Sequence, residues 1–238
     1  MTVAQPKKSD LGVRVASALV MVLVAGTALW LGGWWWTAFV AAVALGVLWE
    51  WWGLVRLICG QSPLRAVWMI GGSFYVGVAA LLLAVIGNDA VMGSTDGHAA
   101  IGLLVPILLV VIATDVGAYF SGRTIGGPRI APSISPSKTW AGLLGGMALA
   151  SIVLATFAGF GIIRTSILAA SAAGALLAVA AQVGDFFESW MKRRAGVKDS
   201  GKLLPGHGGL FDRVDGLLAV ANTVAIVAAV SLFNSTDL

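Results

Sequence analysis

Long apolar runs separated by short polar segments make up most of this chain. The runs cover residues 11–31, 35–58, 67–86, 99–120, 141–159, 162–182 and 216–233. A helix needs about 20 apolar residues to cross the hydrocarbon core of a bilayer, and every run approaches or reaches that length. The pattern predicts an all-α, polytopic membrane bundle of about seven transmembrane helices, or eight or nine helices in all.

The N-terminal end has the outline of a signal peptide, because polar and basic residues 1–10 precede the run 11–31. That run is too long for a typical signal peptide and lacks a clear cleavage site, so we predict a retained first span. Glu50 lies in the next run, within the cluster WEWWGL. Tryptophans at both ends of this run predict an aromatic belt at the bilayer interface. They are Trp34, Trp35, Trp36, Trp49, Trp51 and Trp52.

The composition supports a membrane protein and excludes other classes. Apolar residues make up 58% of the chain, charged residues 11%, and the mean hydropathy of +0.93 is too high for a water-soluble domain. The net charge of +4 does not indicate a nucleic-acid partner, because the cations lie between the apolar runs, where topology signals are placed. Cys59 is the single cysteine, so neither an intramolecular disulfide nor a cysteine-based zinc site can form.

The distribution of the cations predicts the orientation of the chain. If the N-terminus is cytoplasmic, all of the 15 Lys and Arg residues except Arg164 fall in inside segments. This asymmetry follows the positive-inside rule. We therefore expect a multi-pass protein of the inner cell membrane with its charged segment facing the cytoplasm. No internal repeat is visible, and we treat residues 1–238 as a single transmembrane domain, with residues 1–100 as its N-terminal spans.

Residues 182–216 carry nearly half of all the charge in the chain. This segment holds the acids Asp185, Glu188, Asp199, Asp212 and Asp215, and the cations Lys192, Arg193, Arg194, Lys198, Lys202 and Arg213. Crossing a bilayer does not require such a density, so it predicts chemistry on a polyanion. Asp115, near the inner end of its run, is expected at the same depth as the acids at the neighbouring helix ends.

Four of these polar residues predict one helix face and a metal site. Gln182, Asp185, Glu188 and Lys192 follow a spacing of three to four residues, which forms a single stripe if the helix continues past the apolar run. Carboxylates without clustered His or Cys favour a hard cation such as Mg²⁺, which needs only one or two of them beside phosphate oxygens. We predict a magnesium site at Asp185 and Asp212, with Glu188 as a further ligand. The alternative is that these acids pair with lysines and arginines of the same segment.

Two further segments predict phosphate binding. Residues 135–139, SPSKT, place hydroxyls and a lysine immediately before a helix, whose free N–H groups favour anions. Residues 205–209, PGHGG, allow the backbone to approach a ligand closely. His207 in this turn is either a donor to phosphate or a structural turn residue. A turn without a ligand would have a similar sequence.

The run 189–215 resembles the signature of the phosphatidate cytidylyltransferase family, the CDP-diacylglycerol synthases. Every fixed position of that signature is met, by Ser189, Lys192, Arg193, Lys198, Asp199, Gly201, Leu204, Pro205, His207, Gly208, Gly209, Asp212, Arg213 and Asp215. Upstream, ATDVGAYFSGR and SPSKTWAG are similar to further family segments. The resemblance therefore covers residues 100–238, the expected catalytic half, and is weak before residue 100.

The resemblance implies a nucleotidyltransferase that converts CTP and phosphatidate to CDP-diacylglycerol and pyrophosphate. It implies Mg²⁺ at Asp185 and Asp212, beside a monovalent cation such as K⁺, with Lys192 and Asp215 also catalytic. The implied substrate-binding residues are Ser135, Lys138, Thr139, Arg193, Lys198, His207, Gly208, Gly209, Arg213 and Asp115. The implied partners are CTP, phosphatidate, membrane lipids and a second copy in a homodimer.

Two other functions stay open on the sequence. A CTP-dependent polyprenol kinase would use a related cytoplasmic site but would transfer the γ-phosphoryl group and release CDP. A transporter would also be apolar with a few intramembrane acids, but transporters tend to place those acids near the midplane on broken helices. Here the acids gather at one face of the membrane, which favours the synthase.

Overall fold

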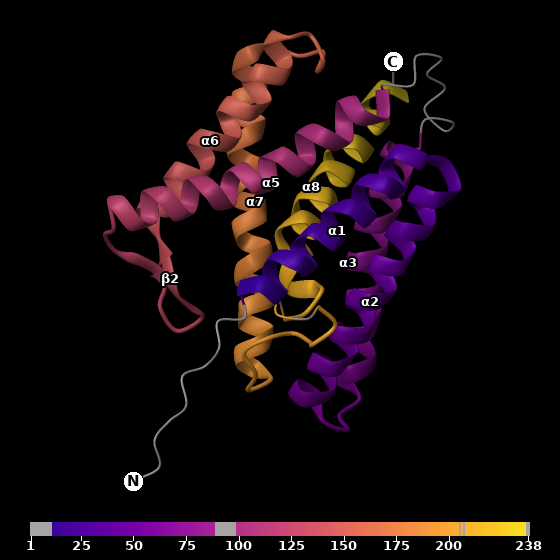
Figure 1. Ribbon diagram of the computed structural model, residues 1–238, viewed down its shortest axis with the longest axis vertical. Helices are drawn as coiled ribbons and strands as arrows, with labels where there is room; N and C mark the ends of the chain where they lie inside the picture. Colours follow the sequence, from indigo (N-terminus) through magenta and orange to yellow (C-terminus); the bar gives the residue numbers. More distant parts are fainter. Residues whose placement is uncertain (1–10, 89–98, 205, 207, 237–238) are drawn as a thin grey trace.

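The computed structural model describes residues 11–88, 99–204, 206 and 208–236, and these residues form an all-helical bundle with one small hairpin (Figure 1). The helices are α1 (Leu11–Leu31), α2 (Gly33–Cys59), α3 (Leu64–Ile86), α5 (Ala99–Thr124), α6 (Trp140–Gly159), α7 (Ile167–Arg194) and α8 (Phe211–Thr236). Each predicted span overlaps one of these helices, and the apolar part of α1, Val15–Leu31, is shorter than the spans that follow it. From α2 onward, these helices are long and apolar enough to cross a membrane, which makes the chain an integral membrane protein.

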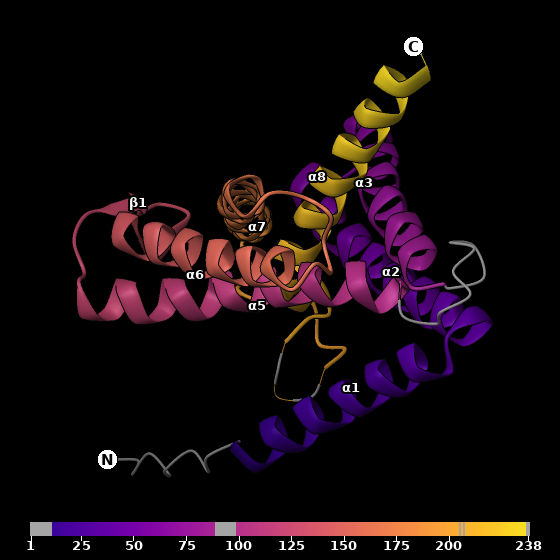
Figure 2. The ribbon, with the colours of Figure 1, turned by 90° about the horizontal axis from the view of Figure 1, so that it is seen from above.

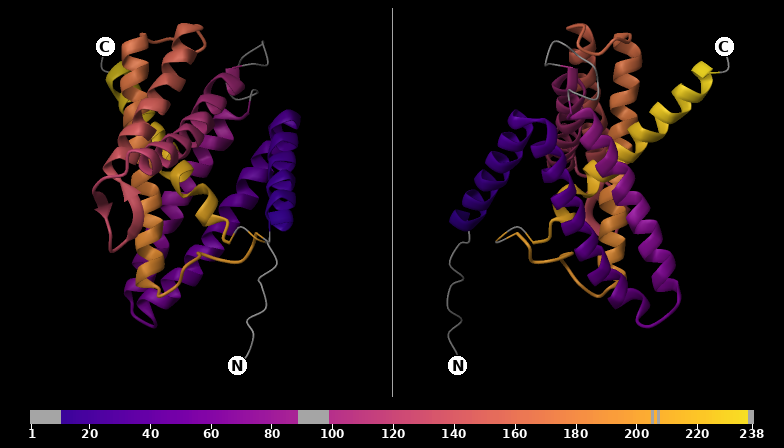
Figure 3. Two further views of the ribbon diagram at one scale, coloured as in Figure 1. Left: turned by 60° about the vertical axis from the view of Figure 1, so that its left-hand side comes forward. Right: turned by 90° about the vertical axis from the view of Figure 1, so that its right-hand side faces the viewer.

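The helices pack in two groups that meet along α7 and α8. Helices α5 and α6 lie side by side, and α7 packs against α6, as the view from above shows (Figure 2). Helices α2 and α3 form a second pair, which contacts α8. Helix α1 lies at the outside, next to α2 (Figure 3). The C-terminal end of α7 contacts the N-terminal end of α8 through Lys192 and Asp212, and this is where the charged segment lies.

Two helices extend further than the apolar pattern predicts. Helix α7 continues past Gln182 to Arg194, and α8 begins at Phe211, before the apolar run starts at Gly216. The end of α7 is stabilised by three cations in its last turn, which interact favourably with the helix dipole. The predicted polar stripe of α7 is therefore one continuous helix face.

A two-stranded antiparallel hairpin, β1 (Arg129–Ala131) and β2 (Ser135–Thr139), lies in the polar segment between α5 and α6. The Ile134 N–H donates to the Ala131 carbonyl at 3.1 Å and closes the turn between the strands. Thr139 then caps α6, because its Oγ1 accepts the Gly142 N–H at 3.1 Å. The hairpin positions Lys138 beside α7.

The tryptophan belt is only partly confirmed. Trp34, Trp35 and Trp49 are exposed on the outside of the bundle, as predicted. Trp36 and Trp51 are buried instead, and their indole N–H groups donate to the Leu83 and Trp68 carbonyls at 2.8 and 3.1 Å. A buried indole needs such a partner, and both carbonyls belong to α3. These two tryptophans therefore tie α2 to α3.

The close packing of α5 on α6 depends on glycine. A Cβ at Gly117 would lie 2.5 Å from the Gly145 carbonyl oxygen of α6. We expect Gly117→Val to lower the stability of the protein by about 1–3 kcal/mol, because the two helices must separate. Thermal unfolding in detergent measures the effect. Gly77→Ala on α3 is the control, since nothing lies within 4 Å of a Cβ there. Equal melting temperatures for the two variants would contradict the prediction.

Candidate active site

The polar stripe of α7 carries two groups of ion pairs about two helical turns apart. Gln182 and Glu188 are buried, and Asp185 and Lys192 are partly exposed. Asp185 binds a lysine of the hairpin, and Lys192 binds acids of α7 and α8. Helix α7 therefore contributes to both groups, with Asp185 in one and with Glu188 and Lys192 in the other. The predicted spacing is confirmed, and its residues do face the other elements of the charged segment.

Lys192 lies between two carboxylates. Its Nζ is 2.5 Å from Glu188 Oε2 and 2.6 Å from Asp212 Oδ1. Glu188 is only 1% exposed, and its second oxygen, Oε1, has no hydrogen-bond partner among the described residues. A buried carboxylate oxygen without a partner is costly and is typical of a functional site. This group can accept a further cation or donor.

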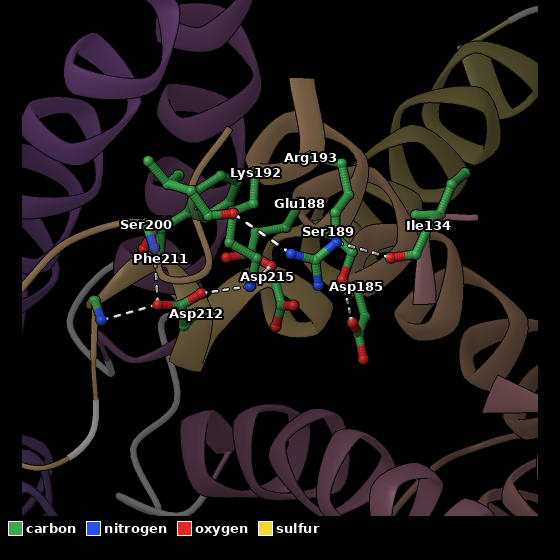
Figure 4. Close-up of polar contacts among 12 residues, drawn as sticks. Ile134, Asp185, Glu188, Ser189, Lys192, Arg193, Ser200, Phe211, Asp212 and Asp215 are labelled. Carbon is green, nitrogen blue, oxygen red and sulfur yellow. Dashed lines mark hydrogen bonds and ion pairs between the residues drawn. The ribbon is translucent and has the colours of Figure 1, made fainter. Parts of the chain in front are cut away.

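Asp212 is the most tightly held acid of the site (Figure 4). Its Oδ2 accepts the Ser200 N–H at 3.0 Å and the Gly209 N–H at 2.8 Å. Its Oδ1 accepts the Lys192 ammonium. The α7–α8 loop thus folds its backbone donors around Asp212 at the start of α8. The carboxylate has one fixed orientation, which is what a metal or phosphate site requires.

The second group joins the hairpin to α7. Lys138 forms an ion pair with Asp185 Oδ2, and the Ser189 hydroxyl donates to Asp185 Oδ1 at 3.4 Å. Asp215 interacts electrostatically with Asp185 and is drawn between Asp212 and Asp185 in Figure 4. The acids of α7 and α8 are thus brought to one end of the bundle, as the sequence predicts.

A polar cavity of about 350 Å³ opens next to Lys138. Its polar lining comes from α5, the hairpin and α7: Asp115, Tyr119, Arg123, Ser137, Lys138, Thr139 and Gln182. Asp115 interacts electrostatically with both Lys138 and Asp185. The cavity therefore joins the predicted segments ATDVGAYFSGR and SPSKT at one place, and two cations line it.

The other predicted site residues lie around these groups. Ser135 is buried at the start of β2. Arg193 turns toward the hairpin and donates to the Ile134 carbonyl at 3.3 Å (Figure 4). Lys198 and Arg213 are exposed. Gly208 has a φ of 82°, which favours glycine, and lies beside Asp212. His207 lies outside the described residues.

The residues present fit a magnesium ion in kind. No group of three or more His, Cys, Asp or Glu that could hold a metal lies within residues 11–88, 99–204, 206 and 208–236. Magnesium does not need one, since one or two carboxylates suffice when substrate phosphates complete its shell. Asp212 and Glu188 converge on one positive charge, the Lys192 ammonium, and Glu188 keeps a free oxygen. Asp185 takes part in a separate ion pair with Lys138, so the predicted pair Asp185 and Asp212 is divided between the two groups.

Glu50 is the residue that the sequence interpretation missed. We assigned its segment to the aromatic belt, but Glu50 is 3% exposed and accepts three hydrogen bonds, two from the α7–α8 loop and one from the first residue of α8. An acid within an apolar span is costly unless it is paired, and this signal alone could have identified it.

An apolar groove of about 690 Å³ runs between α3, α7 and α8. It is lined by aromatic side chains such as Trp51, Trp68 and Phe187 and by small residues such as Gly72 and Gly184. Tyr75 also lines it and interacts electrostatically with Asp215. Gly184, which lines the groove, packs against the Asp215 carbonyl, so the groove passes beside the start of α8.

Fold and site together define an integral membrane enzyme with paired acids and lysines at one end of a helical bundle. The chain belongs to the cytidylyltransferase family, whose model matches residues 64–231, and it is a nucleotidyltransferase. It is 34% identical to a phosphatidate cytidylyltransferase of Brucella suis biovar 1 (strain 1330), over 93% of this chain and 94% of the relative.

Similar proteins occur in two further organisms. A phosphatidate cytidylyltransferase of Pseudomonas aeruginosa is 36% identical over 71% of this chain and 62% of the relative. One of Helicobacter pylori (strain 26695) is 43% identical over 56% of this chain and 49% of the relative. The match to the Brucella protein extends over nearly the whole chain, whereas the resemblance in the sequence is weak before residue 100.

Proposed function

We propose that this chain transfers a cytidylyl group from CTP to phosphatidate and releases CDP-diacylglycerol and pyrophosphate. The observation that carries the proposal is the convergence of Asp212, Glu188 and Lys192 beside the loop of the family signature. The relatives that match this chain are phosphatidate cytidylyltransferases. We further propose that the protein lies in the inner cell membrane as a homodimer with its site facing the cytoplasm. The clustering of the cations at the site, with Arg164 at the opposite end, supports that orientation.

The chemistry requires alignment and neutralisation of charge more than a base. A phosphate oxygen of phosphatidate is already anionic near neutral pH and can attack the α-phosphorus of CTP directly. The bond to the β-phosphate then breaks, and pyrophosphate leaves. Asp212 and Glu188, with Asp185, would hold Mg²⁺, which neutralises the triphosphate and the leaving group when bound. A monovalent cation such as K⁺ would lie beside it.

The lysines have a defined part in this proposal. Lys138 lines the polar cavity and is paired with Asp185. A triphosphate in the cavity would attract the Lys138 ammonium and leave Asp185 available for a cation. Lys192 stays between Glu188 and Asp212 and keeps both carboxylates oriented. Arg123 and the Thr139 hydroxyl provide further donors in the same cavity.

The lipid substrate would reach the site by a route separate from that of CTP. The apolar groove between α3, α7 and α8 is large enough for part of an acyl chain, and at Gly184 it passes beside the Asp215 backbone. The phosphate of phosphatidate would reach the site at the membrane surface while its chains stay in the bilayer. CTP would arrive from water through the polar cavity.

The proposal predicts that the cytidylyl group of CTP, with its α-phosphate, is transferred to the lipid. We expect purified protein, given phosphatidate, Mg²⁺ and CTP labelled at the α-phosphate, to move the label into the lipid phase and to release pyrophosphate. The measurement is lipid extraction followed by chromatography of both phases. A chelator in excess over Mg²⁺ is expected to stop the transfer, and added Mg²⁺ to restore it.

Label at the γ-phosphate of CTP is the control for that experiment. If γ-label enters the lipid and CDP is released, the protein is a lipid kinase and the proposal is wrong. If neither label enters the lipid with phosphatidate or polyprenol present, the enzymatic assignment at this site fails.

A further inference from the structure

Glu50 accepts three hydrogen bonds from the loop and helix that carry the site. Its Oε1 accepts the Leu210 N–H at 2.9 Å. Its Oε2 accepts the Phe211 N–H and the Ser200 hydroxyl, both at 2.8 Å. Glu50 belongs to α2, outside the segment of the family signature, and it contacts the same loop as Asp212 does.

These bonds fix the start of α8. The first N–H groups of a helix have no partner within the helix, and a carboxylate there also interacts favourably with the helix dipole. Glu50 supplies acceptors for two of these groups from another helix. Ser200 belongs to the same arrangement, because its N–H binds Asp212 while its hydroxyl binds Glu50. Glu50 and Asp212 therefore hold the same stretch of backbone, at Ser200.

Two positions of the loop have no room for a side chain beside Glu50. A Cβ at Gly201 would overlap the carboxylate of Glu50, and a Cβ at Gly209 would lie 2.6 Å from Glu50 Oε2. Real Cβ atoms do not approach this closely, so both positions need glycine for as long as Glu50 is in place. Gly209 also donates to Asp212 Oδ2. The backbone that orients Asp212 is thus packed directly on Glu50.

We propose that Glu50 is a positioning residue for the cytidylyl-transfer site. It does not touch a substrate, but it holds Ser200, Gly209 and the first turn of α8 so that Asp212 keeps one orientation. This inference deepens the proposed function and rests on it for its kinetic part. The contact itself can be tested without any substrate.

Glu50→Gln is the informative substitution, because it preserves the size of the side chain. All three partners of Glu50 are donors, and a glutamine offers one acceptor oxygen and one donor amide. Whichever way it turns, its amide faces at least one backbone N–H at the start of α8. We expect kcat to fall about 30-fold. KM for CTP is expected to change little, since the polar cavity lies elsewhere.

Amide hydrogen exchange separates positioning from general stability. In the full-length Glu50→Gln protein, purified in detergent without substrate, we expect faster exchange in residues 197–212 and unchanged exchange in α5 and α6. Trp36→Phe is the matched control: it removes one buried hydrogen bond of α2, the one to Leu83, at the far end of the same helix. It is expected to leave kcat and the exchange of residues 197–212 unchanged.

Three outcomes would overturn the inference. They are unchanged exchange in residues 197–212, equally accelerated exchange in all helices, and the same local effect in Trp36→Phe. If Glu50→Gln does not yield folded protein, Ser200→Ala removes one of the three bonds and is expected to show the same local pattern to a smaller degree. A wild-type protein without cytidylyl transfer would refute the proposed function, and the exchange comparison would still test the contact.

Discussion

Asp212→Asn is expected to reduce cytidylyl transfer by at least about 10³-fold while the protein still inserts into the membrane and purifies. Asp212 accepts two backbone N–H groups on one oxygen and the Lys192 ammonium on the other. An asparagine lacks the charge, and its amide must face a donor on one side. The proposed magnesium site would lose its best-oriented ligand. Transfer of labelled CTP to phosphatidate measures the loss, with retention volume in gel filtration as the check on folding.

Arg164→Gln is the control for this substitution. It also removes one charge, but from an exposed position in the α6–α7 turn, at the other end of the bundle. We expect its activity to equal that of the wild type. Near-normal activity in Asp212→Asn would refute the assignment of Asp212, and a comparable loss in Arg164→Gln would show that the assay responds to charge in general.

Lys138→Ala has the second largest expected effect, a fall in kcat/KM for CTP of about 10²- to 10³-fold. Its ammonium lines the polar cavity and lies beside Asp185, so its loss removes a triphosphate contact and leaves an acid without its partner. Because the binding of CTP is affected, KM should rise. Steady-state kinetics with varied CTP measures this.

Arg129→Ala is the matched control, since Arg129 is an exposed cation on the paired strand of the same hairpin. We expect its KM to remain close to that of the wild type. Lys138→Arg should recover part of the activity, because it restores the charge with a different shape. If Lys138→Ala and Arg129→Ala behave alike, Lys138 has no specific part in binding CTP.

Most of the helical framework follows from the apolar runs, because a helix needs about 20 apolar residues to cross the bilayer core. The continuation of α7 also follows from the sequence, since the spacing of Gln182, Asp185, Glu188 and Lys192 is that of a helix. The hairpin does not. Its strands are short and polar, and they are held by contacts such as that of Arg193 with Ile134, which a local pattern does not show.

The sequence predicted which residues form the candidate site, but not which of them pair with one another. The charged segment identifies Asp212, Glu188 and Lys192, yet the sequence cannot tell which acid shares a lysine with which. The position of Glu50 in an apolar span marks it as unusual, but its partners could not be predicted, because they lie about 150 residues further along the chain. Trp51 was misplaced for a similar reason: only the folded chain shows that α3 offers a carbonyl to its indole. Long-range partners decide these cases.

Helix α7 contacts the hairpin on one side and the start of α8 on the other, so it separates the two openings through which products could leave. The polar cavity opens beside the hairpin, whereas the apolar groove lies between α7, α8 and α3. In the proposed reaction, pyrophosphate would leave through the polar cavity on one flank of α7, and the new liponucleotide would leave along the apolar groove on the other. The two products would then leave on different flanks of α7.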